Sequence, residues 1–233
     1  MMSGFFPGLS GLMIKNAVKD FDEISQVNVG LLQNTNAQAG TTGIVDMLQI
    51  ISQRVSGNEQ GSYPGFSKKR KLHFGRSFMK RSVRAIHHDE KGYIISRLGI
   101  RNVNYWTAWN QAIFNIFVSF TIRVGLIKHI INMKKPHVLS KFVKHNRMKE
   151  EVAYLSIEVT GESEGETRKK VYTLTTPSDY QVTAMVTASL IAVIDSGNSG
   201  VVFPFELTDV DTILKLMQSD KLTLKIHTNE KIL

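Results

Sequence analysis

The sequence predicts an α+β fold, in which a mixed or antiparallel β-sheet is covered by helices. Two observations support this. Apolar and polar residues alternate in residues 152–160 and again in 170–176, the period of half-buried strands. Other segments, such as residues 8–21, have apolar residues at near-helical spacing. Strands in hairpins with intervening helices indicate an α+β domain, and no internal repeat or linker divides the chain, so residues 1–233 are interpreted as a single domain.

The N-terminal half is expected to begin with a helix that Ser10 is placed to cap. A loop rich in Gly, Asn and Thr follows the first strand, and Thr41 or Thr42 is expected to cap the helix after it. Residues 93–98 fit neither period clearly. The expected elements are a helix over 8–21, a strand over 24–32, a helix over 43–54, a loop over 56–67, strand-like pieces at 71–74 and 82–87, and a strand over 102–106.

The C-terminal half has the clearer pattern. In the strand over residues 152–160, Ala153, Leu155, Ile157 and Val159 are expected to face the core. An acidic, glycine-bearing turn over 161–167 is expected to join this strand to the next. The remaining expected elements are a helix over 111–131, a helical turn or two at 138–144, a strand over 170–176, an apolar helix over 181–194, a short strand or loop over 200–205, a helix over 210–218 capped by Asp209, and a strand over 222–226.

Composition limits the classes of function. The formal net charge of +9 suggests acidic partners, such as nucleic acid, an anionic membrane, or anionic substrates and cofactors. The absence of cysteine excludes disulfides, thiol catalysis and cysteine metal sites. The most apolar run, 112–122, is too short for a membrane span, and no signal peptide is recognised. A cytoplasmic location is therefore expected.

The positive charge is concentrated in residues 68–84, which hold eight Lys or Arg and no acid. Lys68, Arg70 and Arg76 are therefore candidate anion-binding residues. One alternative is nucleic-acid binding, with Phe74 and other aromatic residues stacking on bases. The reading we favour is a solvated edge hairpin whose charges prevent pairing with another sheet.

No segment of the chain has the G-x-G-x-x-G spacing that holds a dinucleotide pyrophosphate at a helix N-terminus. The adjacent His87 and His88 invite a metal interpretation, but neighbouring side chains on a strand point to opposite faces. No metal site is predicted. His87 is a candidate proton donor to a substrate.

Three segments occur in order: VAYLSIEVTGESEGETRKKVYTLTT, TAMVTASLIAVIDSG and GVVFPFEL. Together they resemble the C-terminal domain of the saccharopine dehydrogenase-like oxidoreductases. Near the start, GFFPGLSGLMIKNAV resembles the segment where these enzymes enter the substrate domain, and GTTGIVDMLQII resembles the next loop and helix. The residues that match the family pattern are Thr160-Gly161 and Gly165 in the hairpin turn, Thr183-Ala184 and Gly197 at the two ends of a helix, and Gly200-Val201, Pro204 and Glu206 after it.

The resemblance implies that residues 1–233 are one substrate-binding and dimer-forming domain without a nucleotide-binding domain. Family members reduce an imine, or oxidise a secondary amine, with NAD or NADP, and the hydride chemistry belongs to that cofactor. This chain alone is therefore expected to bind no cofactor and to be inactive. The implied partners are a second copy of the chain, a Rossmann domain in cis or in trans, and a small anionic substrate resembling an amino acid. No catalytic residue is assigned.

The same resemblance directs attention to two glycine-bearing helix starts. Gly4, Pro7 and Gly8 form a turn whose free N–H groups are expected to face a substrate carboxylate, because a helix N-terminus favours an anion. Gly40, Thr41 and Thr42 form a second such start. Other classes of function remain open: a basic module that binds nucleic acid, and a purely structural or regulatory dimer. The sequence favours the oxidoreductase domain over nucleic-acid binding, because it contains no recognised nucleic-acid motif.

Overall fold

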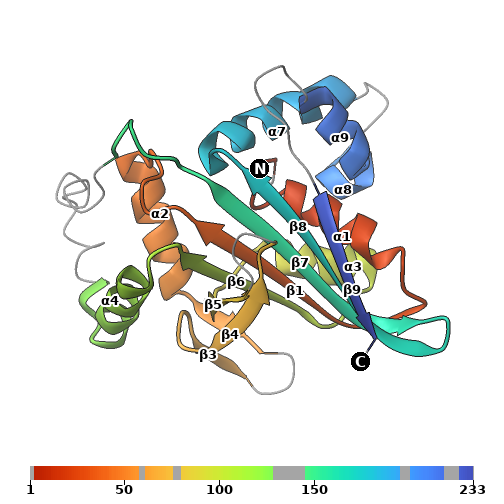
Figure 1. Ribbon diagram of the computed structural model, residues 1–233, viewed down its shortest axis with the longest axis horizontal. Coiled ribbons are helices and arrows are strands. Elements are labelled where there is room, and N and C mark those ends of the chain that lie inside the picture. Colours follow the sequence, from red (N-terminus) through yellow and green to blue (C-terminus); the bar gives the residue numbers. More distant parts are fainter. Residues whose placement is uncertain are drawn as a thin grey trace.

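The computed structural model describes residues 3–57, 61–75, 80–127, 145–194, 200–217 and 226–232. These residues form an α+β fold with a curled mixed sheet covered by helices (Figure 1). The main sheet has the strand order β4-β5-β6-β1-β7-β8-β9, and a separate small hairpin pairs β2 with β3. The strands are β1 (Glu23–Gln33), β2 (Arg54–Ser56), β3 (Ser62–Pro64), β4 (Lys69–His73), β5 (Lys80–Ala85), β6 (Val103–Trp109), β7 (Ala153–Ser163), β8 (Glu166–Thr176) and β9 (Ile226–Ile232).

Strands β1 and β6 are parallel, with Val27 opposite Val103 and Gln33 opposite Trp109. The other neighbouring pairs of described strands are antiparallel. The carboxyl ends of β1 and β6 therefore meet at one end of the sheet, which positions the cleft described below.

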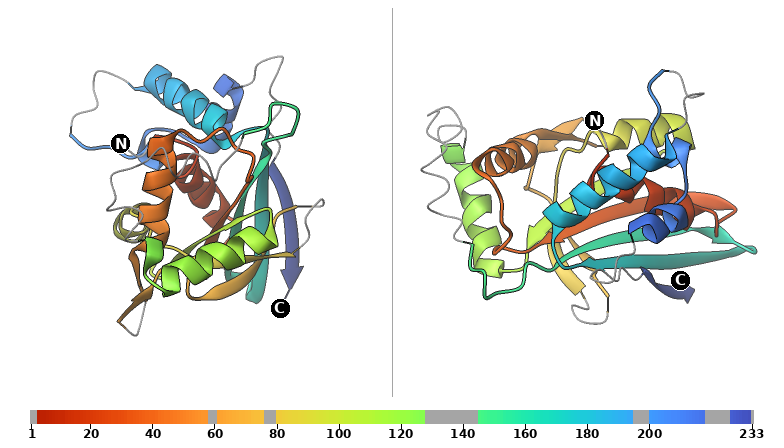
Figure 2. Two further views of the ribbon diagram at one scale, coloured as in Figure 1. Left: turned by 90° about the vertical axis from the view of Figure 1, so that its left-hand side faces the viewer. Right: turned by 90° about the horizontal axis from the view of Figure 1, so that it is seen from above.

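Helix α1 is central to the helical layer, because it contacts β1, β7 and β8 on one side and the shorter helices α3, α8 and α9 on the other. Figure 2 shows α1, α7 and α9 on the same face of the sheet. No helix in the described ranges is both long and apolar enough to cross a membrane. The helices are α1 (Leu9–Val18), α2 (Thr41–Ser52), α3 (Glu90–Leu98), α4 (Ala112–Arg123), α7 (Asp179–Val193), α8 (Pro204–Leu207) and α9 (Val210–Met217).

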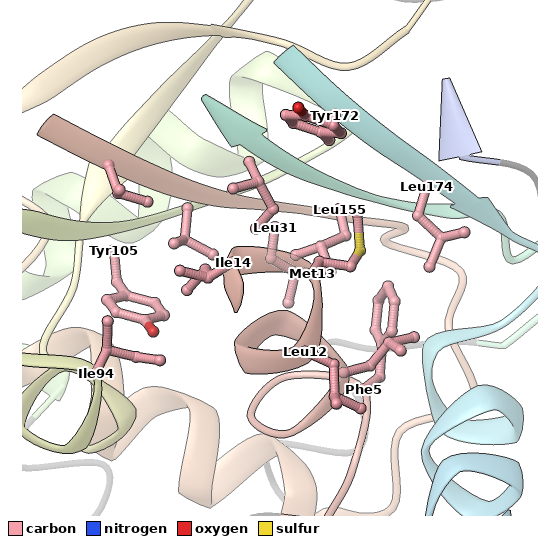
Figure 3. Close-up of a cluster of buried hydrophobic side chains, with 14 of the residues drawn as sticks. Phe5, Leu12, Met13, Ile14, Leu31, Ile94, Tyr105, Leu155, Tyr172 and Leu174 are labelled. Carbon is pink, nitrogen blue, oxygen red and sulfur yellow. The ribbon is translucent and has the colours of Figure 1, made fainter. Parts of the chain in front are cut away.

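The main hydrophobic core lies between this helical layer and the sheet (Figure 3). Leu12, Met13 and Ile14 of α1 are buried against apolar side chains of the strands, including Leu31 and Leu155. The predicted core face of β7 is confirmed, since all four of its members are fully buried: Ala153, Leu155, Ile157 and Val159.

The opposite face of the sheet is covered by the basic hairpin of β4 and β5. A Cβ atom on Gly30 of β1 would lie 2.5 Å from Leu72 Cδ1, so only glycine lets the hairpin approach this closely. The backbone N–H of His73 donates to Glu158 Oε1 at 2.9 Å, and Lys169 Nζ lies 2.5 Å from Glu158 Oε2. The hairpin thus explains why Glu158, on the polar face of β7, is buried as well.

The position of β4 at the edge of the sheet confirms the interpretation of the basic stretch as an edge hairpin. The ambiguous residues 93–98 belong to α3, which ends at Gly99 in the left-handed conformation. Strand β9 is Ile226–Ile232, so of the strand predicted over 222–226 only Ile226 lies within the described residues. Several predicted features lie outside the described residues: the end of the helix over 111–131, the turns at 138–144, Gly197, and residues 222–225.

Several local predictions need correction. Ser10 does not cap α1, because Gly8 is the N-cap and Ser10 lies inside the helix. Helix α2 begins at Thr41 with Gly40 as its N-cap, so Thr41 and Thr42 lie inside the helix and neither is its cap. The hairpin turn is only Glu164 and Gly165, because both adopt the positive φ that a tight two-residue turn needs. The segment predicted as a strand or loop over 200–205 is a loop as far as Phe203, and only its last two residues belong to α8, where Pro204 occupies a first helical position that suits its fixed φ.

Candidate functional site

A cleft opens at the end of the sheet where the parallel strands β1 and β6 finish. Ligands of open α/β sheets commonly bind outside the carboxyl ends of parallel strands. The cleft consists of two adjoining chambers, of 660 Å³ and 380 Å³. Helix α2 borders both chambers, α4 borders the larger one and the start of α7 reaches both, at the end of the sheet where Figure 1 shows α2. Four residues line both chambers: Gln33, Gly43, Met47 and Tyr180.

The larger chamber is rich in side-chain amides that bond to one another or to the backbone. Asn110 Oδ1 accepts from the backbone N–H of Thr35 at 3.0 Å, and its Nδ2 donates to Asn34 Oδ1 at 3.2 Å. Asn36 Nδ2 donates to the carbonyl oxygens of Asn146 and Lys149, at 3.0 and 2.9 Å. These bonds fasten the ends of β1 and β6 together and attach residues 146–149 to the rim of the chamber.

The smaller chamber has an apolar wall and an acidic lining. Its apolar wall includes Phe6, Leu31 and Ile50. Its carboxylates are Asp46 on α2, Asp89 before α3 and Asp179 at the start of α7, and its described lining contains no Lys or Arg. A wall of this kind favours a ligand that is positively charged at one end.

Gln33 lies at the junction of the chambers and is 9% exposed. Its Nε2 donates to Asp179 Oδ2 at 3.4 Å, whereas its Oε1 accepts no hydrogen bond from the described part of the chain. The carboxylate fixes the orientation of the amide, because the flipped amide would place two acceptor oxygens together. A buried acceptor without a donor costs about 1–3 kcal/mol, so Gln33 Oε1 calls for a donor from a ligand or from solvent.

Asp179 is 8% exposed and is the first residue of α7. Burial raises the pKa of its carboxyl group, while the hydrogen bonds from Gln33 and from the backbone N–H of Tyr180 oppose the rise. The nearby Glu151 adds to the rise in this pKa. Asp179 is thus a carboxylate whose ionised form lacks a positive partner among the described residues.

Tyr180 divides the cleft. A Cβ atom on Gly43 would lie 3.1 Å from Tyr180 Oη, so the tyrosine hydroxyl lies over the first turn of α2. Burial, followed by the charges of Asp179 and Asp46, raises the pKa of Tyr180, and the hydroxyl therefore stays protonated. It is a hydrogen-bond donor and acceptor at the passage between the two chambers.

His87 and His88 follow β5 instead of belonging to a strand, so the strand geometry expected for them does not apply, and both line the smaller chamber. Their environments nevertheless differ. His88 is buried, stacks on Tyr105 with ring centroids 4.2 Å apart, and has an Nδ1 atom without a hydrogen-bond partner in the described part of the chain. Burial lowers the pKa of His88 to about 3, so its ring is neutral at physiological pH. His87 lines the smaller chamber with its Nε2 3.0 Å from Asp89 Oδ1, which leaves its predicted role as a proton donor open.

The turn formed by Gly4, Pro7 and Gly8 lies beside the smaller chamber, and Pro7 lines it. The expected free N–H groups are a wrong prediction. The N–H of Gly8 donates to Glu90 Oε1 at 2.9 Å, and the N–H of Leu9 donates to the carbonyl of Gly4 at 2.9 Å. A carboxylate does occupy this helix start, but it belongs to the protein.

The second predicted helix start, at Gly40, Thr41 and Thr42, borders the cleft more directly. Neither chamber is lined by these three residues, but the next residue, Gly43, lines both. Helix α2 thus borders the cleft with its side, and among the described residues no side chain caps its start. The positive end of the helix dipole lies beside the cleft and favours an anionic group there.

The predicted anion-binding residues are separate from the cleft. Lys68 Nζ lies 4.0 Å from the ring centroid of Tyr63, and Arg70 Nη2 donates to Gln26 Oε1 at 3.3 Å. Neither residue lines the two chambers, and Arg76 lies outside the described residues. Phe74, proposed above to stack on bases, is fully buried and cannot do so without leaving the core.

Four residues of the cleft were not predicted from the sequence: Gln33, Asp46, Asp179 and Tyr180. One signal was present for Gln33, since a polar residue that ends an apolar strand at the carboxyl edge of a parallel pair commonly faces a ligand site. Asp179 and Tyr180 approach Gln33 only through the pairing of β8 with β7 and of β7 with β1, which spacing in the sequence does not reveal.

Comparison with known proteins gives no relative: no family model matches the chain, and no curated protein matches it.

Proposed function

We propose that this chain is the substrate-binding and dimer-forming domain of a saccharopine dehydrogenase-like oxidoreductase. The observation that carries the proposal is the cleft at the ends of β1 and β6, where a buried, unpaired acceptor lies between an acidic chamber and an uncapped helix start. An amino-acid-like secondary amine has the matching groups, because its nitrogen donates hydrogen bonds and its carboxylates accept them.

In this proposal the carboxylate end of the substrate lies in the larger chamber, near the start of α2 at Gly43, and the amine nitrogen lies near Gln33 Oε1. The Tyr180 hydroxyl lies where the two ends meet and can hydrogen-bond to either. The apolar wall of the smaller chamber excludes water from that end. These residues bind and orient the substrate.

The residues present do not fit a dinucleotide. The segment from β1 into α2 has Gly40 and Gly43 at the spacing of the last two glycines of the fingerprint, but Gln38 stands where its first glycine is needed. We therefore propose that NAD or NADP, which supplies the hydride in such enzymes, is held by a Rossmann domain beyond residues 1–233, and that this chain alone does not catalyse the reaction.

A thermal-shift assay of the full chain tests this proposal. Saccharopine, at about 100 times its dissociation constant, is expected to raise the melting temperature by roughly 5–10 °C, whereas NADPH and NADH leave it unchanged. A clear shift with either nucleotide would contradict the proposal, because the described residues provide no dinucleotide fold. Failure of saccharopine and related secondary-amine amino acids to give any shift would contradict it as well.

The dimer in this proposal is supported by the outer face of α4. Four apolar residues on α4 are each more than half exposed and occupy positions i, i+3, i+4 and i+7, so they share one face of the helix: Ile113, Ile116, Phe117 and Phe120. Exposed apolar faces of this kind mark interaction sites, and a face without charge can pair with its own copy across a two-fold axis. The mass in solution should correspond to a dimer, and Phe117→Glu should shift it to that of a monomer.

A further inference from the structure

The smaller chamber has a charge opposite to that of the whole chain. The formal net charge is +9, yet Asp46, Asp89 and Asp179 line this chamber and no described Lys or Arg does. The remaining titratable groups in its lining are His87, which pairs with Asp89, the buried and neutral His88, and Tyr180. A concave, low-dielectric surface with carboxylates concentrates cations.

A second, independent observation is the set of buried atoms that lack partners. Within the described ranges, Gln33 Oε1 is an acceptor without a donor, and the side-chain donor that reaches Asp179 there is Gln33 Nε2 at 3.4 Å. His88, whose buried Nδ1 has no partner among the described residues, also belongs to the lining of this chamber. An ammonium group has three N–H donors and no acceptor, so it complements Gln33 Oε1 and Asp179 together.

The size and the walls of the chamber limit the rest of the ligand. Its volume of 380 Å³ equals that of roughly a dozen water molecules at ~30 Å³ each. Phe5, Phe6, Leu31, Met47 and Ile50 provide apolar contacts for a short hydrocarbon chain. A small inorganic cation would leave most of this apolar surface uncovered, whereas an alkyl chain covers it.

We propose that the smaller chamber is a binding site for a protonated alkylamine. The ammonium group is held by Asp179 and Gln33 Oε1, the alkyl chain lies against the apolar wall, and Asp46 adds negative charge on the side of α2. The inference rests on the proposed substrate-binding role of the cleft and specifies that role: the end of the substrate in this chamber is cationic, where the sequence predicted an anionic substrate.

The test is a titration of the full ¹⁵N-labelled chain with 1,4-diaminobutane, followed by NMR. Succinate and 1,4-butanediol, which have the same number of carbon atoms, serve as anionic and neutral probes. Only the diamine is expected to shift the backbone resonances of residues around the chamber. Equal responses to the diol or to succinate would overturn the proposal, because they would show that charge is not recognised.

Variants assign the response to the chamber. Asp179→Asn is expected to weaken diamine binding at least tenfold, and Gln33→Met is expected to weaken it severalfold without a change of charge. Asp211→Asn, which removes an equal charge from the exposed side of α9, should leave binding unchanged within twofold. Diamine binding that survives both cleft substitutions in folded protein would overturn the proposal.

The diamine titration and the thermal-shift assay can fail independently, so the amine site and the proposed function are tested separately. Diamine binding together with a thermal shift by NADPH would contradict the oxidoreductase substrate domain and leave the amine site standing. A thermal shift by saccharopine without any response to the diamine would leave the substrate domain standing and refute the amine site.

Discussion

Glu90 beneath α1 and Gln33 in the cleft are both buried polar side chains, but their hydrogen bonding differs. Glu90 is 1% exposed, and its carboxylate accepts from the Gly8 N–H, from Ser10 Oγ at 2.6 Å and from Tyr105 Oη at 2.8 Å. Gln33 Oε1 accepts nothing from the described chain. The first group holds α1 against α3 and β6, whereas the second belongs to the cleft in which we propose that a ligand binds. If that proposal holds, the satisfied group should matter for stability and the unpaired one for binding.

The largest effect on stability is expected when the Glu90 carboxylate is removed. Glu90→Ala would leave the Gly8 N–H and two buried hydroxyl groups without an acceptor, which is expected to lower the free energy of unfolding by about 3 kcal/mol. Urea denaturation measures this change. Glu166→Ala, on the exposed hairpin, is the control and should cost less than about 0.5 kcal/mol. Equal unfolding midpoints for the two variants would show that the buried Glu90 carboxylate stabilises the fold no more than an exposed one.

The next effect is a pH dependence that arises from His88. Burial lowers its pKa to about 3 in the folded protein, whereas an unfolded chain has a histidine pKa near ~6.5. The unfolded state therefore binds the proton first. The stability contributed by the neutral ring is complete above pH ~6.5 and is lost as the pH falls toward 3, by about 1.4 kcal/mol per pH unit.

His88→Phe should remove this dependence, because phenylalanine keeps the stacking on Tyr105 and cannot titrate. The measurement compares the free energies of unfolding of the two proteins at pH 6.5, 5.5 and 4.5. As the pH falls, the free energy of unfolding of the parent protein should decrease more than that of the variant. Parallel curves would mean that His88 is protonated in the folded state and that its site is more open than the structure indicates.

The sequence predicted the scaffold better than the site, for a physical reason. Alternation and helical spacing depend on local burial, and they identified α1, β1, β7, β8 and α7 within a few residues. The site depends on contacts between distant segments. Glu90, which follows His87 and His88 in the chain, reaches the start of α1, 82 residues away, and this long-range hydrogen bond overturned the expected role of Gly8.

Gln33 is expected to matter little for stability and much for binding. Gln33→Leu removes an acceptor that has no partner and one long hydrogen bond to Asp179, so the free energy of unfolding should change by less than about 1 kcal/mol. Saccharopine and 1,4-diaminobutane should both bind more weakly to this variant. A large loss of stability would show that Gln33 Oε1 is already paired in the folded protein, and the contrast with Glu90 would disappear.

The smallest effect on stability is expected from Gly43→Ala, which narrows the passage between the chambers. Alanine favours a helix over glycine by up to ~1 kcal/mol, but its Cβ would lie 3.1 Å from Tyr180 Oη and would displace that hydroxyl. The two effects oppose each other, and the change in unfolding free energy should stay within about 0.5 kcal/mol.

Gly92→Ala on α3 is the matched control, because no heavy atom lies within 4 Å of the added Cβ. It should stabilise the protein and leave binding unchanged. In Gly43→Ala, saccharopine, which is long enough to reach both chambers, should lose more affinity than 1,4-diaminobutane, which needs only the smaller one. If both ligands lost affinity equally, Tyr180 would be part of the amine site itself. The diamine occupies only the smaller chamber, so it can lose as much affinity as saccharopine only if Tyr180 contacts both ligands.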